Sequence, residues 1–528
     1  MVLGDKNLWD VIVIGTGMGG AVAGYELAKA GKKVLFVERG AGANKLKFGE
    51  KTVSDDPIDR LRGGLWPNKF STNIDNVNFE AFPFIGCGVG GSTNLYASQL
   101  ERFLPVDFES GAFCPNSLGA DTPTKWPISY YEIEPYYRLA ESLFKVRGGK
   151  DPNNLDPASS YFKPPEMSPR DKELYEYLKS RGLNPYRSHV ACDFLPDCTE
   201  CGGLICPKEC KNDSRKICIG PAVNQYGASL VTDCEVISLE SNEREILYIN
   251  CKHRNELHRL RAKKYILAAG ALASPIILLR SSNEYWKSGL GNRSGLVGKN
   301  LMFHASDYFL CWSVRGGNPG GAIKKSFSLN DFYTKDDKKL GTIQAVGVSV
   351  NSKNIQTFLQ NNVSRMPRVI RLFVPLPLII ILANLASMIF RRSSLFASIV
   401  EDFPYRGNKV YINSKGETAI QYFRSKDLQD RTRLISSELR KYNSKSGFFV
   451  KIPQRKNLNY GHPCGTLRFG LNPATSVLDK NNKLHDLANI YVTDASFFPT
   501  SGGVNPSLTI AANALRVAQH ISSIFDDE

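Results

Sequence analysis

The chain has 528 residues and a formal net charge of +16, and 42% of its residues are hydrophobic while 22% are charged. These proportions are typical of a globular protein and exclude a disordered or fibrous chain. Because 528 residues are too many for one simple core, two domains are expected.

The first elements of the chain predict a dinucleotide-binding unit. Residues 10–14 (DVIVI) are expected to form a buried strand, which is followed by the segment 15–20 (GTGMGG) and a helix over residues 21–30. The glycines of such a turn let the chain approach a pyrophosphate at the N-terminus of the helix. Glu38 follows a second strand, residues 33–37, where an acidic side chain binds a ribose 2′-hydroxyl group.

Cysteines are concentrated in one segment, residues 192–218. Thiolates at this density favour a metal over packing, and three interpretations are open: an iron–sulfur cluster, a structural zinc site, and free thiols or disulfides. The candidate metal ligands are Cys198, Cys201, Cys206, Cys210 and Cys218.

Residues 372–390 form a run of 19 residues without a charge, preceded by Arg371 and followed by two further arginines. The run is long enough to span a bilayer. A single crossing, however, would separate residues that the dinucleotide domain needs on the same side, and prolines 375 and 377 suit a segment that lies on a surface. Two interpretations remain: a patch on the membrane surface that collects a lipophilic substrate, and a buried helix. The arginines and the net positive charge favour an anionic lipid surface.

Two polar residues near the C-terminus, His462 and Asn505, each follow a glycine-containing segment and each precede a proline. A neutral imidazole accepts the proton of a hydroxyl group, and the N–H of a carboxamide stabilises the oxygen that remains. This pair therefore predicts the oxidation of an alcohol, with the dinucleotide as the acceptor of the hydride.

Further motifs occur in order along the chain, at residues 88–94 (GVGGSTN), 126–130 (WPISY), 270–275 (GALASP) and 297–301 (VGKNL). Together with the glycine-rich segment 15–20 and the pair His462 and Asn505, these motifs resemble the glucose-methanol-choline (GMC) family of FAD-dependent alcohol oxidases and dehydrogenases. The resemblance is to bacterial members in particular. The resemblance implies an α/β fold in which a Rossmann-like FAD-binding domain is interleaved with an α+β substrate-binding domain. The expected FAD-binding domain comprises residues 1–105, 215–300 and 455–528. The expected substrate-binding domain comprises residues 106–214 and 301–454, with a Cys-rich insertion at 192–218.

The same resemblance assigns roles to residues. It implies oxidation of a primary or secondary alcohol to an aldehyde or ketone by hydride transfer to flavin, with His462 as general base and Asn505 on the substrate oxygen. The residues expected to contact FAD are Gly15, Gly17, Met18, Gly19, Gly20, Glu38, Arg39, Gly90, Gly91, Ser92, Asn94, Val236, Ala269, Gly270, Asp494, Ala495 and Pro506. A helix beginning after Pro506 would stabilise the anionic reduced flavin. His304 is interpreted as structural.

Two points concern the redox partners. Several members of the family bind FAD covalently through a histidine of the motif that corresponds to residues 88–94. No histidine precedes His189 in this chain, so non-covalent FAD is expected. The spacing of Cys201, Cys206 and Cys210 resembles that in iron–sulfur dehydrogenases of the family, although residues 211–216 depart from their pattern. The acceptor of the electrons is therefore oxygen, or a carrier reached through a cluster.

Two other function classes remain open: a lyase in which the flavin is only structural, and a catalytically silent flavin-binding module. The expected partners are a small alcohol, the electron acceptor and, through the basic surface, a membrane. Nucleic acid is not expected, since no basic run is interleaved with aromatic residues. No signal peptide is visible ahead of the first strand, so the expected location is the cytoplasm, with peripheral attachment to a membrane.

Overall fold

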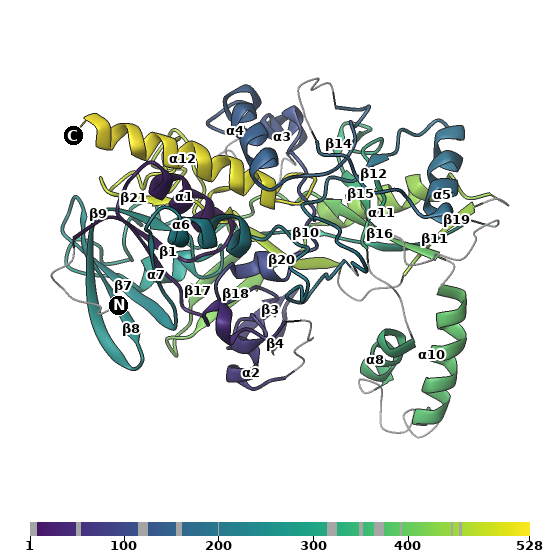
Figure 1. The fold of residues 1–528 in the computed structure, drawn as a ribbon, viewed down its shortest axis with the longest axis horizontal. Coiled ribbons are helices and arrows are strands. Elements are labelled where there is room, and N and C mark those ends of the chain that lie inside the picture. Colours follow the sequence, from purple (N-terminus) through teal and green to yellow (C-terminus); the bar gives the residue numbers. More distant parts are fainter. Residues whose placement is uncertain are drawn as a thin grey trace.

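The structure, a computed structural model, contains two main sheets that lie side by side (Figure 1). A mainly parallel sheet with its helices occupies the left of the view, and an antiparallel sheet occupies the right. The described residues are 8–48, 54–114, 125–154, 161–198, 200–313, 325–347, 352–363, 374–390, 393–444, 447–452 and 457–527. The expected α/β fold is confirmed.

The first sheet has seven strands in the order β6-β2-β1-β9-β8-β7, with β21 beside β9. Its strands are β1 (Leu8–Ile14), β2 (Val34–Val37), β6 (Ser229–Val231), β7 (Cys234–Ser241), β8 (Ile246–His253), β9 (Glu256–Leu267) and β21 (Ile490–Val492). Five strands run parallel, and β7 and β8 extend the sheet as an antiparallel ribbon. Residues 11–14 are fully buried because a parallel strand at this position is covered on both faces.

Helices from distant parts of the sequence cover this sheet. The C-terminal helix α12 (Ser507–Asp527) packs against α1 (Met18–Lys29) and α4 (Tyr130–Leu143), as Figure 1 shows at the upper left. The shorter elements on this side are the π-helical segment η5 (Arg215–Ile219), α6 (Gly220–Asn224) and α7 (Ser274–Arg280). The parallel sheet and these helices thus come from four separate stretches of chain, within residues 8–37, 130–143, 215–280 and 490–527.

The second sheet has eight strands, all antiparallel, along the path β19-β11-β16-β15-β12-β5, with β10 joining β16 to β20. Its strands are β5 (Tyr186–Arg187), β10 (Met302–Ala305), β11 (Tyr308–Ser313), β12 (Phe327–Leu329), β15 (Gly341–Ala345), β16 (Ser393–Val400), β19 (Gly447–Lys451) and β20 (Leu458–Cys464). Helix α11 (Lys426–Arg440) contacts β16 and β19, and α5 (Pro169–Ser180) contacts β11.

A smaller sheet of four strands, in the order β17-β18-β3-β4, connects the two halves. It consists of β3 (Phe70–Ile74), β4 (Val77–Ala81), β17 (Lys409–Ile412) and β18 (Thr418–Tyr422). The remaining elements are β13 (Thr334–Lys335), β14 (Lys338–Lys339), α2 (Pro57–Arg62), α3 (Pro105–Phe108) and the 3₁₀ segments η1 (Ala43–Lys45), η2 (Gly91–Asn94), η3 (Ser110–Phe113) and η6 (Ala495–Phe497). We retain the domain limits given above as a proposal.

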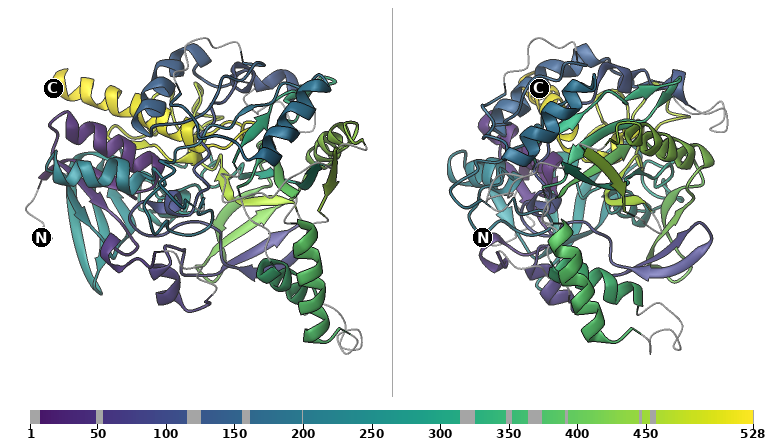
Figure 2. Two further views of the ribbon diagram at one scale, coloured as in Figure 1. Left: turned by 45° about the vertical axis from the view of Figure 1, so that its right-hand side comes forward. Right: turned by 90° about the vertical axis from the view of Figure 1, so that its right-hand side faces the viewer.

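Two further helices stand apart from the rest of the molecule, at the lower right of Figure 1 and again in both views of Figure 2. They are α8 (Ser352–Val363) and α10 (Leu376–Phe390), and they pack against each other. Most large apolar side chains of α10 are exposed, so the interpretation of this segment as a buried helix is wrong for the described residues. In the part of the chain that the structure describes, no helix is both long and apolar enough to cross a membrane.

Candidate active site

One cavity of about 860 Å³ lies between the three sheets. Its lining includes the segments that follow β1, β2, β9 and β21, that is, the carboxyl ends of four parallel strands. Ligands of open parallel sheets bind at this edge. Of the residues expected to contact FAD, fourteen line the cavity and three, Gly20, Gly90 and Asn94, do not. Both His462 and Asn505 also line it.

The glycine-rich turn after β1 leaves room for a ligand at one glycine and closes against the chain at another. A Cβ atom on Gly17, the residue that caps α1, would meet no atom of the chain within 4 Å. A Cβ atom on Gly19 would lie 1.9 Å from the carbonyl oxygen of Thr493. The backbone at Gly17 and the N-terminus of α1 are therefore open to the cavity, as a bound pyrophosphate requires.

Glu38 connects three loops at the edge of this cavity. Its Oε2 accepts hydrogen bonds from the backbone N–H (3.1 Å) and the hydroxyl (2.5 Å) of Thr16. Its Oε1 accepts from the N–H groups of Gly40 (2.8 Å) and Gly88 (3.1 Å). This carboxylate therefore holds the glycine-rich loops together.

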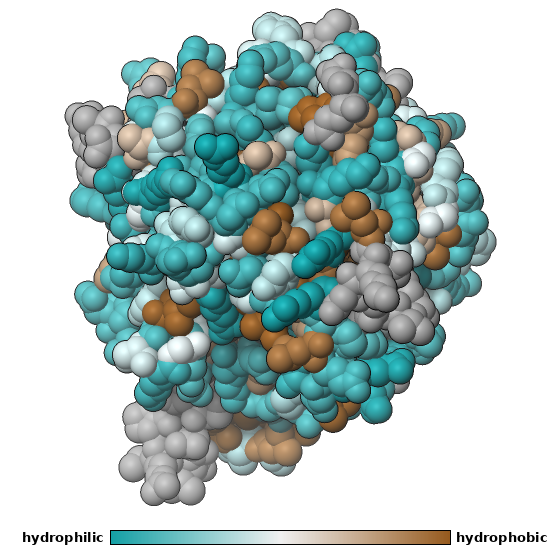
Figure 3. All heavy atoms as spheres, turned by 90° about the vertical axis from the view of Figure 1, so that its left-hand side faces the viewer, coloured by the Kyte–Doolittle hydropathy of each residue, from teal (hydrophilic) through white to brown (hydrophobic). Residues whose placement is uncertain are grey.

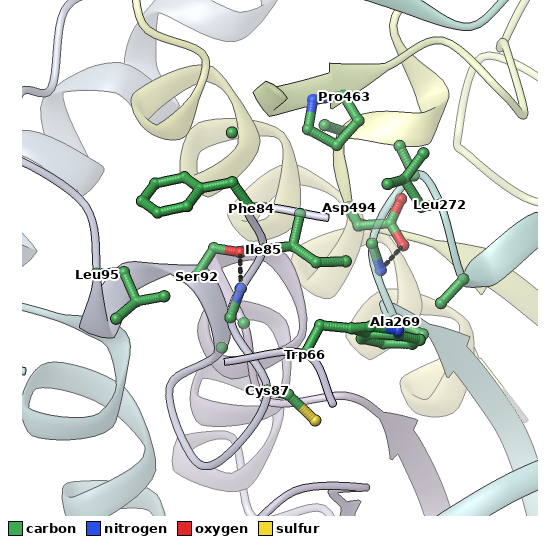
Figure 4. A pocket seen from close by; sticks show the side chains of 18 of the residues that line it. Trp66, Phe84, Ile85, Cys87, Ser92, Leu95, Ala269, Leu272, Pro463 and Asp494 are labelled. Carbon is green, nitrogen blue, oxygen red and sulfur yellow. Dashed lines mark hydrogen bonds between the residues drawn. The ribbon is translucent and has the colours of Figure 1, made fainter. Parts of the chain in front are cut away.

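Asp494 also links separate segments of the cavity wall (Figure 4). Its Oδ2 accepts a hydrogen bond of 2.8 Å from the N–H of Gly270, which follows β9. Its Oδ1 accepts from the N–H of Ser496 at 2.9 Å. These bonds fix the C-terminal segment against the turn that begins α7.

The loop over residues 88–94 reaches the cavity through Gly91 and Ser92. The Ser92 hydroxyl accepts a hydrogen bond from the N–H of Gly86 at 2.9 Å (Figure 4). Asn94 is fully buried behind the loop, where its amide donates to the carbonyl of Val89 at 2.8 Å. Gly90 adopts a left-handed conformation with φ 101°. Asn94 and Gly90 therefore shape the loop rather than line the cavity.

His462 lies on β20 and contacts a second histidine on the neighbouring strand β10. The Nδ1 atoms of His462 and His304 are 3.0 Å apart, and their rings meet edge to face. This contact was not expected from the sequence, in which His304 was interpreted only as structural. The antiparallel pairing of β10 with β20, in which His304 faces Asn459, is what brings the two rings together.

The hydrogen-bond partners of His304 indicate which nitrogen of each ring carries a proton. His304 Nε2 lies 3.1 Å from the carbonyl oxygen of Ser501 and 2.9 Å from that of Gly502, so Nε2 must be the donor. In a neutral ring, His304 Nδ1 is then an acceptor, and we assign the proton between the rings to His462 Nδ1. This assignment leaves a lone pair on His462 Nε2.

A competing contact is made by Asn459, whose amide nitrogen lies 3.2 Å from His462 Nδ1. One tautomer cannot satisfy both contacts. We favour the bond to His304 because its distance is shorter and because the alternative would leave the lone pairs of two Nδ1 atoms facing each other at 3.0 Å.

Both rings are held in the neutral form. Burial, and then the adjacent His304, keeps the pKa of His462 well below its ordinary value. Burial lowers the pKa of His304 to about 4. At neutral pH, His462 is therefore free to accept a proton.

Asn505 lies two residues before the first residue of α12. Its Oδ1 atom is buried and has no hydrogen-bond partner among the residues that the structure describes. An unpaired polar atom on the wall of a cavity is typical of a ligand contact. Pro506 and Ser507 also line the cavity, so the N-terminal end of α12, which favours negative charge, points into it.

The loop that precedes Asn505 is supported by a buried charged cluster that sequence analysis did not detect. Lys339 Nζ lies 2.6 Å from Asp107 Oδ1 and 2.7 Å from Glu401 Oε2, and all three side chains are fully buried. Glu401 also accepts a hydrogen bond of 3.2 Å from the N–H of Gly502. The hydroxyl of Tyr333 joins Asp107 to the N–H of Gly503. Because these residues come from separate elements, no local pattern in the sequence indicates the cluster.

The cysteines separate into different places. Cys192, Cys206 and Cys210 are buried together, with Cys198 and Cys201 packed against them, whereas Cys218 belongs to the main core. Among the described residues, no group of three or more His, Cys, Asp or Glu side chains is arranged to hold a metal ion. The iron–sulfur and zinc interpretations of Cys198, Cys201, Cys206, Cys210 and Cys218 are therefore not supported.

Family models match three parts of the chain. Models described as GMC oxidoreductase match residues 129–306 and 421–514, which together exceed half of the chain, and a model described as FAD binding domain matches residues 10–47. The chain belongs to the GMC oxidoreductase family. It is a flavoprotein enzyme whose relatives oxidise CH–OH groups of alcohols and sugars. The open space at Gly17 and at the N-terminus of α1 is what the pyrophosphate of an FAD molecule requires.

Relatives cover nearly the whole GMC chain. It is 28% identical to 6'''-hydroxyparomomycin C oxidase of Streptomyces lividus, over 98% of this chain and 92% of that protein. It is 24% identical to 2-methyl-1,2-propanediol dehydrogenase of Mycolicibacterium austroafricanum, over 98% of this chain and 96% of that protein. The crystal structure of pyridoxine 4-oxidase from Mesorbium loti has a TM-score of 0.66 at 18% identity and covers 97% of this chain and 99% of its own. This last likeness shows the fold.

Proposed function

We propose that the protein oxidises a primary or secondary alcohol to an aldehyde or ketone, with His462 as general base and Asn505 on the substrate oxygen. The observation that supports this most strongly is that both side chains line the cavity bordered by the glycine-rich turn after β1. Bound FAD supplies the acceptor for the hydride.

In this proposal, His462 Nε2 removes the hydroxyl proton as the carbon–hydrogen bond breaks. Its Nδ1–H remains bonded to His304, which fixes the ring and disperses the positive charge that the ring acquires. The carboxamide N–H of Asn505 binds the oxygen on which negative charge develops. His304 touches the base and not the cavity, so it positions His462 rather than reacting.

We also propose that FAD is held without a covalent bond by the fourteen expected residues that line the cavity. Gly17 and the N-terminus of α1 would bind the pyrophosphate, and Asp494 with Ala495 would lie along the ribityl chain. Val236, near the start of β7, and Arg39, just after the end of β2, line the same cavity. These two residues would contact the adenosine part of FAD.

A lipophilic substrate is favoured by the wall opposite the FAD-binding loops. Largely apolar side chains from β11, from β16 and from the residue after β15 line the cavity there, namely Tyr308, Ala397, Ile399 and Val346. Gln344 is a polar exception on β15. An apolar wall of this kind gains affinity from each methylene group that it removes from water.

The first prediction tests the function itself. When 1-butanol, 1-octanol or 1-dodecanol is added without oxygen, the yellow flavin of the holoenzyme should bleach, and fastest with the longer alcohols. Admission of air then identifies the acceptor. Rapid recovery of colour with release of hydrogen peroxide indicates an oxidase, whereas recovery only with a quinone or dye indicates a dehydrogenase. A lyase or a silent flavoprotein would stay yellow with every alcohol and sugar tested, and that result would refute the proposal.

The second prediction concerns the site of FAD. The variant Gly17→Leu should fold, because no atom of the chain lies within 4 Å of the new Cβ, but should purify without colour, because the side chain enters the space of the pyrophosphate. The ratio of absorbance at 450 nm to that at 280 nm measures the FAD content, and a circular dichroism spectrum shows whether the variant is folded. Gly407→Leu is a matched control, since Gly407 is exposed and equally uncrowded. A yellow Gly17→Leu protein would show that FAD binds elsewhere.

A further inference from the structure

Helix α10 exposes more large apolar side chains than any other helix that the structure describes. Seven of its large apolar residues are exposed, among them Ile381 at 56%, Leu385 at 55% and Met388 at 67%, and the others are Leu376, Leu378, Ile380 and Leu382. By contrast, the face of the molecule seen in Figure 3, on the side of the first sheet, is mostly hydrophilic with apolar residues in small separate groups. A continuous apolar surface of this kind marks an interaction site.

Helix α8 covers only a narrow stripe of α10. The buried residues of α10 are Ile379, Ala383 and Ser387, which are spaced four apart and so lie on one side of the helix. Ile355 of α8 is buried with them. Among the side chains of α10 that the structure describes, the large apolar ones on the other sides are exposed.

The charge of this part of the chain identifies the partner. Residues 341–400 contain six Lys or Arg residues and no Asp or Glu residue. The basic residues include Arg371 before α10 and Arg391 after it, and the chain as a whole has a net charge of +16. An apolar helix set in a basic stretch is suited to the interface of an anionic bilayer, where apolar side chains enter the acyl region and basic ones meet the headgroups.

The helix pair is also connected directly to the cavity. The segment that contains α8 and α10 leaves the second sheet after β15 and returns to it at β16. These two strands are antiparallel neighbours, with Ala345 opposite Phe396. Both carry residues that line the cavity, namely Gln344 on β15 and the apolar Ala397 and Ile399 on β16.

We propose that α10 and α8 dock the protein on the surface of an anionic lipid bilayer, and that an apolar alcohol dissolved in that bilayer reaches the cavity along β15 and β16. The second part of this proposal rests on the proposed function, whereas the docking does not. Helix α10 is about 22 Å long at 1.5 Å per residue, which is shorter than the ~30 Å hydrocarbon core. The chain also enters and leaves at adjacent strands, so the helix lies in one leaflet and does not cross.

Docking is tested first, as the third prediction, with vesicles of phosphatidylcholine alone and with 40% phosphatidylglycerol. The wild-type holoenzyme should sediment with the anionic vesicles at low salt, less so at ~0.5 M salt, and weakly with neutral vesicles. The variant I381D/L385D should bind roughly tenfold more weakly or worse, because two exposed apolar contacts are replaced by charges that anionic lipid repels.

A matched control is L257D/L471D, which makes the same change at two leucines that are 74% and 75% exposed elsewhere on the surface. It should bind vesicles as the wild type does. FAD content and circular dichroism show whether each variant is folded. If I381D/L385D misfolds, I381S/L385S removes the same apolar surface without adding charge and should also bind at least several-fold more weakly.

Two results would overturn the docking proposal. One is equal vesicle binding by I381D/L385D and the control, which includes the case in which the wild-type protein does not bind anionic vesicles at low salt. The other is a wild-type dimer that I381D/L385D converts to a monomer without any vesicle binding, since the apolar surface would then belong to a second copy of the chain.

Delivery of the substrate is tested separately with 1-dodecanol embedded in anionic vesicles and with 1-butanol in solution. I381D/L385D should oxidise the embedded alcohol more slowly than the L257D/L471D control does and should oxidise 1-butanol equally fast. Equal rates on the embedded alcohol would overturn delivery. If no alcohol bleaches the wild-type flavin, the proposed function fails, and the vesicle-binding result still stands by itself.

Discussion

Replacement of His462 by alanine is expected to slow flavin reduction by alcohol roughly 10²- to 10⁴-fold, the range associated with loss of a positioned general base. The reason lies in the neutral state of the ring, which burial maintains, and in its Nε2 lone pair, which the bond to His304 leaves free. Asn505→Ala is expected to slow the same step by about 10²-fold, because the developing negative charge loses a hydrogen-bond donor.

Stopped-flow measurement of flavin bleaching with 1-octanol, without oxygen, reports this step directly. FAD should stay bound in both variants, since neither side chain is expected to hold the cofactor. His520→Ala is a suitable control, because His520 lies on α12 and does not line the cavity. Near wild-type bleaching in either active-site variant would remove that residue from the mechanism.

Lys339→Met is expected to lower the free energy of unfolding by about 3–5 kcal/mol, which is the cost of leaving buried charges without their partner. Asp107 and Glu401 would both stay buried, and Glu401 helps to hold Gly502 near the base. Burial already raises the pKa of Glu401. Without the lysine that pKa rises further, so the folded state binds the proton more tightly than the unfolded state does. The loss of stability should therefore be largest at neutral pH and should shrink as the pH falls toward the ordinary carboxyl range.

Urea unfolding followed by circular dichroism measures this change, at a fixed concentration of FAD because bound cofactor adds stability of its own. Lys338→Met is the matched control, since its side chain is the exposed neighbour on β14 and should change stability by no more than about 0.5 kcal/mol. A Lys339→Met protein as stable as this control at neutral pH would show that Lys339 does not stabilise the buried carboxyl groups, and would contradict this prediction.

The parts of the fold that were predictable from the sequence are those whose signal is local. A run such as residues 10–14, followed by glycines and an acid after the next strand, reflects one strand–turn–helix unit and its backbone requirements. The C-terminal pair was recognisable for a similar reason, because His462 and Asn505 each lie in a distinctive short segment. The structure places both on the cavity wall.

The partners of these residues could not be predicted in the same way. His304 lies 158 positions before His462, and only the pairing of β10 with β20 brings the rings into contact. The pairing of Lys339 with Asp107 likewise joins residues that are far apart in sequence, and a lysine on a short strand is ordinarily solvent-exposed. Contacts of this kind depend on tertiary structure, which one sequence does not reveal.

The apolar run was ambiguous for a different reason. Composition alone does not distinguish a helix buried in a core from a helix that projects from the surface, since both are apolar on most sides. Only the position of α10 outside the second sheet, beside α8, decides between them.

The attachment of α8 and α10 to two adjacent antiparallel strands has an evolutionary consequence. Ala345 and Phe396 are paired neighbours, so everything between them occupies the place of a hairpin turn. The entropy needed to close such a turn rises only slowly with its length. A lineage can therefore lengthen, shorten or lose this segment while the sheet beneath keeps its register. Under the docking proposed above, attachment to a membrane and the chemistry of the cavity are traits that natural selection can change separately.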